Sequence, residues 1–112
     1  MSLAPWETEE FDEDRRQLCY TTLDMAAVYA DKHQESHPSI EIANLWGDIS
    51  RACNRDTETR DQILELGRAL IGIRCAVDSD TDIQSSDEEE LLRAINLVYR
   101  AAVVLLSLCK EA

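Results

Sequence analysis

The sequence predicts an all-α protein, an antiparallel four-helix bundle formed by a single domain over residues 1–112. Apolar residues recur at spacings of three and four through almost the whole chain. Strict alternation and clusters of β-branched residues, which are typical of strands, do not occur. Short polar breaks divide the chain into four segments, and short connections favour antiparallel neighbours.

The first predicted helix covers residues 8–34 and carries two adjacent apolar stripes. One stripe contains Phe11, Leu18, Thr22, Met25 and Tyr29, and the stripe beside it contains Cys19, Leu23, Ala26 and Ala30. Pro38 ends this helix, because the residue before a proline is driven out of the α region. Residues 1–7 precede the periodic pattern, and we expect them to be flexible.

The second and third helices are predicted over residues 39–54 and 57–77, separated by a short polar connection with capping residues. The apolar positions of the second are Ile42, Leu45, Trp46, Ile49, Ala52 and Cys53. The third has a regular seam of Ile63, Leu66, Leu70, Ile73 and Val77. Gly67 and Gly72 fall within this third helix, where we expect them to allow a neighbour to pack closely.

The fourth predicted helix covers residues 86–111 and begins with Ser86, whose spacing to Glu89 is that of a capping box. Its apolar surface is wider than one face of a bundle helix requires. Either this helix is central in the monomer or part of its surface is covered by another chain, and with three other helices available we favour a homodimer. The predicted interface consists of Val98, Ala101, Val104, Leu105 and Leu108.

The charge of the chain excludes several classes of partner. It contains 11 Lys and Arg against 23 Asp and Glu, a formal net charge of −12. Phosphates of nucleic acids and anionic lipid surfaces repel such a polyanion, so we expect neither nucleic acid nor membrane as a partner. The apolar segment from Leu91 to Cys109 is interrupted by two arginines, and its charge-free part is too short to span a bilayer. No secretory signal is recognisable at the N-terminus, and we expect a cytoplasmic protein.

Two segments hold the excess of acids, residues 7–14 and 78–90. Both lie at predicted helix starts, where one or two carboxylates stabilise the helix dipole, but the second run exceeds that need. An antiparallel bundle places it at the same end as His33 and His37, with Lys32 as the main nearby base. We predict that this end binds a basic protein partner. The predicted contact residues are Asp78, Asp80, Asp82, Asp87, Glu88, Glu89 and Glu90.

Catalytic and metal-binding patterns are weak. The segment from Asp78 to Glu89 has the ligand spacing of a calcium-binding EF-hand loop, but Ile83 occupies the position that requires glycine. Phosphate-binding glycine loops and nucleophile motifs are missing, and we expect no cofactor. The four cysteines include no C-x-x-C pair, and we expect them to be reduced and buried.

The sequence therefore favours a small, acidic, non-catalytic interaction module, of the kind found among inhibitors, immunity proteins, antitoxins and adaptors. The alternative is a divalent-metal-binding protein or metal-dependent helical enzyme that uses the acidic segment between the third and fourth helices.

Overall fold

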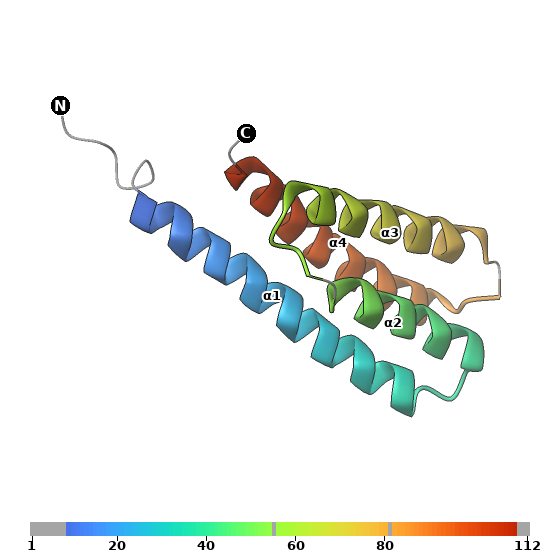
Figure 1. The fold of residues 1–112 in the computed structure, drawn as a ribbon. Coiled ribbons are helices and arrows are strands. Elements are labelled where there is room, and N and C mark those ends of the chain that lie inside the picture. The colour runs from blue at the N-terminus through green and yellow to red at the C-terminus, as the bar shows by residue number, and fades with distance from the viewer. Residues whose placement is uncertain (1–8, 55, 81, 110–112) are drawn as a thin grey trace.

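The computed structural model describes residues 9–54, 56–80 and 82–109, and these form an all-α four-helix bundle (Figure 1). The helices are α1 (Glu9–Ser36), α2 (Ile40–Cys53), α3 (Arg60–Ser79) and α4 (Ser85–Leu108). No strand occurs in these ranges. The predicted fold class is confirmed, whereas the expectation of flexibility for residues 1–7 lies outside the described residues.

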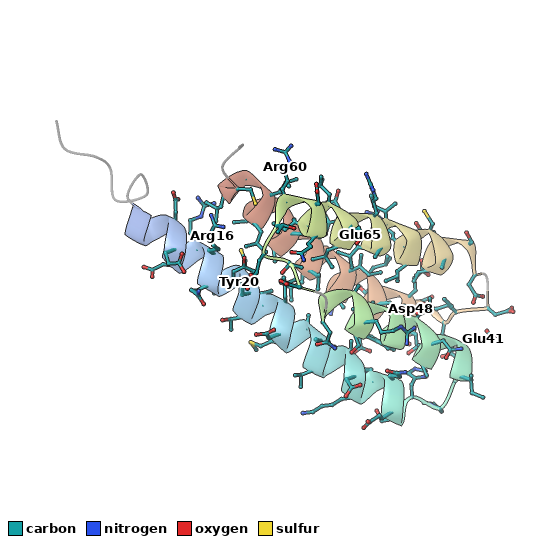
Figure 2. The ribbon with its side chains drawn as sticks, viewed as in Figure 1. Arg16, Tyr20, Glu41, Asp48, Arg60 and Glu65 are labelled. Carbon is teal, nitrogen blue, oxygen red and sulfur yellow. The ribbon has the colours of Figure 1, made fainter. Side chains whose placement is uncertain are left out.

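The four helices form two antiparallel pairs. α1 packs mainly on α2 and α3 mainly on α4, while α1 and α4 join the pairs (Figure 1). The short α2 lies beside the C-terminal half of α1, so the N-terminal half of α1 extends toward the end of α4 (Figure 1). There the Arg16 guanidinium donates to the Leu108 carbonyl oxygen at 2.7 Å (Figure 2). A cation at a helix C-terminus is stabilised by the exposed carbonyl groups.

Two of the predicted helix starts are corrected. α3 begins at Arg60 rather than at residue 57, because Thr59 and Gln62 form a capping box in which each side chain bonds the other's backbone N–H. α4 begins at Ser85, with Gln84 as an N-cap that makes no side-chain bond, so the box predicted at Ser86 does not form. α4 ends at Leu108, since Cys109 has extended backbone angles.

The core contains the predicted α3 seam and most of the predicted apolar positions of α2. The largest fully buried side chain of this core is that of Trp46 in α2. Of the two apolar stripes predicted for α1, the bundle buries Cys19, Leu23 and Ala30 of the second, and Ala27 is buried where Ala26 was expected. The stripe that contains Leu18, Met25 and Tyr29 is exposed instead. α1 therefore presents an apolar stripe that the bundle leaves uncovered.

The glycines of α3 do not serve the predicted close packing. A Cβ atom built on Gly67 or Gly72 would have no neighbour within 4 Å. The close approach occurs in α2, where a Cβ on Gly47 would lie 2.8 Å from Gln34 Nε2. Gly47 thus makes room for a side chain of α1.

The width of the α4 apolar surface is largely explained within the monomer. Val98, Ala101 and Leu105 are buried in the core, and Val104 and Leu108 are partly covered. Three of the five residues predicted for a dimer interface are therefore inaccessible to a second chain unless the bundle opens. The exposed apolar side chains of α4 are Leu97, Tyr99 and Val103.

α4 is also long and apolar enough to cross a membrane, whereas its charge-free part alone is too short to do so. Central helices of soluble bundles share this length and composition. In this structure Leu91, Ile95 and Leu105 of α4 pack inside the bundle.

Candidate functional site

The predicted acidic site lies at the end of the bundle where α1 and α3 finish and α2 and α4 begin (Figure 1). Asp78 is in the last turn of α3, Asp80 and Asp82 belong to the connection, and residues 87–90 occupy the first turns of α4. His33 in the last turn of α1 and His37 directly after this helix face the run as predicted. We call this region the acidic end.

Two of the acids tie α4 to α1. His37 Nε2 lies 3.2 Å from Asp87 Oδ1, while the Ser39 backbone N–H donates to His37 Nδ1 at 3.0 Å. With Nδ1 acting as acceptor, the neutral ring carries its proton on Nε2 and donates it to Asp87. This contact fixes the turn between α1 and α2 against the start of α4.

The second tie is an aromatic cluster. Glu90 accepts a hydrogen bond from the Tyr29 hydroxyl and lies 3.3 Å from His33 Nε2. The His33 ring stacks on Trp46 at a centroid distance of 4.4 Å, and the Tyr29 ring meets both edge-on. The hydrogen bond to Glu90, with burial and the negative charge of Glu90 adding to it, raises the pKa of Tyr29.

The expectation that Lys32 is the main base near the acidic end is corrected by the ion pairs of α3 and α4. Glu89 lies 3.4 Å from Arg93, and Asp78 lies 4.0 Å from Arg74, each within its own helix. These pairs are exposed and contribute little to stability. Asp80 accepts a hydrogen bond from the Asp82 backbone N–H.

Two carboxylates of the acidic end make no such hydrogen bond or ion pair with the described residues. Within the described ranges, neither the Asp82 nor the Glu88 side chain has a hydrogen bond or ion pair. Asp82 is exposed and Glu88 is partly exposed. Their negative charge is available to a partner.

The acidic segment does not form a calcium-binding loop in the described residues. Asp78 is helical in α3 and Glu89 is helical in α4, so only residues 80–84 separate the two helices. In the part of the chain that the structure describes, no group of three or more His, Cys, Asp or Glu side chains is placed to hold a metal ion. The two histidines point to separate carboxylates rather than to a shared centre.

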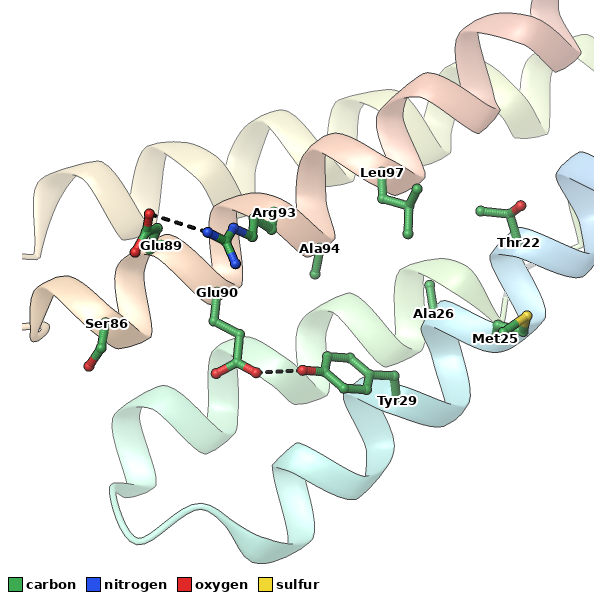
Figure 3. Close-up of a pocket in the computed structure, with 10 residues that line it drawn as sticks. All are labelled: Thr22, Met25, Ala26, Tyr29, Ser86, Glu89, Glu90, Arg93, Ala94 and Leu97. Carbon is green, nitrogen blue, oxygen red and sulfur yellow. Dashed lines mark hydrogen bonds and ion pairs between the residues drawn. The ribbon is translucent and has the colours of Figure 1, made fainter.

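A groove of about 690 Å³ runs between α1 and α4 next to the acidic end (Figure 3). Ala26 and Ala94 face one another across it, and these small side chains leave the space between the helices unfilled (Figure 3). Met25, Tyr29 and Leu97 add apolar surface, and polar residues gather at the end formed by the start of α4. Of the residues that line the groove, Glu89 and Glu90 were predicted as partner contacts, whereas the apolar ones were not assigned to a site. The period of Leu18, Thr22, Met25 and Tyr29 nevertheless indicated an apolar face.

The cysteines differ from the expectation that all four are buried. Cys19 and Cys53 are buried, Cys109 is partly covered and Cys75 is exposed, all as free thiols. Burial raises the pKa of Cys53 to about 12 and also raises that of Cys19, against a smaller opposing effect of Arg15. Neither buried thiol is suited to act as a nucleophile, which requires the thiolate.

Comparison with protein-family models, with curated protein sequences and with solved structures gives no match.

Proposed function

We propose that this chain is a small, non-catalytic protein-interaction module, of the inhibitor, immunity, antitoxin or adaptor kind, that binds a basic protein surface. The observation that carries this proposal is the surplus of carboxylates at the acidic end. Asp87 and Glu90 serve the fold, but Asp82 and Glu88 hold exposed negative charge that no described contact uses. Such clustering speeds the encounter with a cationic surface and rejects anionic ones.

The partner is neither nucleic acid nor membrane, since a net charge of −12 opposes both. The protein resides in a reducing compartment such as the cytoplasm, where the exposed free thiol of Cys75 persists. The proposed interaction requires no cofactor, and no described contact favours the metal-dependent alternative.

The test is copurification from the native host, quantified by mass spectrometry, with a matched pair of charge reversals. The test variant carries Asp82→Lys and Glu88→Lys, and the control carries the same change at Asp14 and Asp24, which are exposed on α1 away from the acidic end. Basic proteins that bind the wild type and the control but are lost from the test variant support the proposal. Equal recovery by both variants, or no basic partner, overturns it.

Homodimerisation is a second proposal, favoured by one exposed apolar face. Leu64 and Ile71 of α3 and Tyr99 and Val103 of α4 line a shallow groove of about 180 Å³. The charged residue that lines it is Arg68, so two copies meeting here avoid their acidic ends. Sedimentation over a wide concentration range should show a dimer that Val103→Asp disrupts, and a monomer at every concentration would overturn this proposal.

A further inference from the structure

We infer that the groove between α1 and α4 binds an amphipathic helix whose flank is basic, supplied by the partner protein. This inference rests on the proposed function and adds to it the binding surface and the form of the partner. It starts from a helical face that the bundle leaves without a neighbour.

The floor of the groove is apolar and accessible. Met25 is 68% exposed, Leu97 is 54% exposed and Tyr29 is 45% exposed, although all three lie at helix-period positions. Leu18, 67% exposed, continues the same stripe along α1. Exposed apolar surface gathered in one concave place is typical of a protein interface, and methionine adapts readily to a partner's shape.

The dimensions suit a helix. The residues of α4 that line the groove extend from Ser86 to Leu97, a length of about 16 Å at 1.5 Å per residue. A partner helix of about three turns covers this length and presents apolar side chains at positions i, i+3 or i+4, and i+7. The opposed alanines Ala26 and Ala94 let such side chains enter between α1 and α4 (Figure 3).

The carboxylates at one end of the groove favour a basic occupant. The groove opens at one end onto Glu89 and Glu90. Glu88, whose side chain has no hydrogen bond or ion pair among the described residues, lies in the same turn of α4. The lining base is Arg93, which already pairs with Glu89. A second copy that docked through the same groove would bring its own Glu89 and Glu90 to this end, so like charges would face one another. A helix with lysine or arginine beside its apolar stripe matches both the floor and the charged end.

The experiment uses a defined probe, a yeast-displayed library of helical peptides of about three turns. Apolar residues vary at the anchor positions, and Lys, Arg, Glu and Gln vary at the flanks. The full chain is the target, and selected peptides are remeasured against Met25→Asp and Leu97→Asp. Val28→Asp is the matched control, because Val28 is 58% exposed on α1 but does not line the groove.

We expect enriched peptides with basic flanks that lose at least about tenfold in affinity to Met25→Asp and Leu97→Asp, and less than about twofold to Val28→Asp. Peptides that are not basic, no enrichment, or equal loss for all three variants would overturn the inference. So would a wild-type dimer that Leu97→Asp dissociates, since a second copy would then occupy the groove.

The proposed binding of a basic protein by the acidic end and the proposed binding of a helix in the groove fail in different ways. A native partner that is lost from Asp82→Lys with Glu88→Lys, but still binds Met25→Asp and Leu97→Asp, refutes the groove and leaves the acidic interaction intact. Basic peptides that select the groove, when no native partner depends on the acidic end, refute the proposed function and leave the groove as a peptide-binding surface.

Discussion

Shortening Leu105 to alanine should destabilise the protein by about 2 to 5 kcal/mol, whereas the same change at Leu97 should cost less than about 1 kcal/mol. Both residues belong to α4, but Leu105 is fully buried and Leu97 is 54% exposed. Losing three buried carbons costs about 2.4 kcal/mol in transfer free energy, and the cavity that remains adds to this. The pair therefore tests which side of α4 faces the core.

Urea unfolding followed by circular dichroism at 222 nm measures both changes. Domains of this size have unfolding free energies of about 5 to 15 kcal/mol, so a loss of about 3 kcal/mol leaves the Leu105→Ala variant folded in water. With an m-value of about 1.5 kcal/mol/M, a loss of 3 kcal/mol lowers the midpoint by about 2 M. The m-value should not change.

Equal destabilisation by Leu105→Ala and Leu97→Ala, or a loss below about 1 kcal/mol for Leu105→Ala, would refute the described packing of α4. The measurement should be repeated at two protein concentrations. A midpoint that rises with concentration would show that association contributes to the stability.

Four further changes follow from the local structure. Thr59→Ala removes one half of the α3 capping box and should lower the free energy of unfolding by about 1 kcal/mol, and no measurable loss in a urea titration would contradict the box. Gly72→Ala should raise the free energy of unfolding by about 0.5 to 1 kcal/mol, because a Cβ meets nothing there. Gly47→Ala should raise the free energy of unfolding by less than Gly72→Ala, since the Gln34 amide must move away. Equal melting temperatures for these two glycine variants would contradict this expectation. The pKa of Cys53 is raised from 9.0 to about 12, so the folded state holds this proton more tightly than the unfolded state. Its stabilising effect is complete below pH 9 and is lost as the pH rises toward 12, by up to about 1.4 kcal/mol per pH unit. Cys53→Ala should remove that part of the alkaline slope, and identical slopes in wild type and variant would contradict the assignment.

The sequence determines the number and order of the helices because the apolar period and the polar breaks are local signals. The α3 seam of Ile63, Leu66, Leu70, Ile73 and Val77 was predictable for this reason, and all five side chains are buried. The juxtaposition of the histidines with the start of α4 was predictable because an antiparallel bundle fixes which helix ends meet.

The orientation of α1 was not predictable, because it carries two apolar stripes side by side and the period alone does not rank them. The bundle buries the stripe of small residues, Cys19, Ala27 and Ala30, with Leu23 among them. Small side chains let α1 approach the neighbour that supplies Trp46, whereas the stripe with Met25 and Tyr29 would hold the backbones apart. The groove follows from this choice, which tertiary packing makes and local sequence does not.

The four consecutive acids of α4 show why charge counting overestimated the free charge of the acidic end. Residues three apart share a helix face, so Asp87 and Glu90 both point toward α1 and the turn after it. Asp87 meets His37 in that turn, and Glu90 meets His33 and Tyr29 of α1. Glu89 faces Arg93 one turn later, and Glu88 is left without such a contact among the described residues. Reversing all four charges would therefore break the fold and the proposed surface together. Reversing Glu88 with Asp82 leaves both contacts to α1 and the turn after it intact. Unfolding measured on that variant gives the helix-dipole cost of losing Glu88 at the start of α4, separately from the loss of binding.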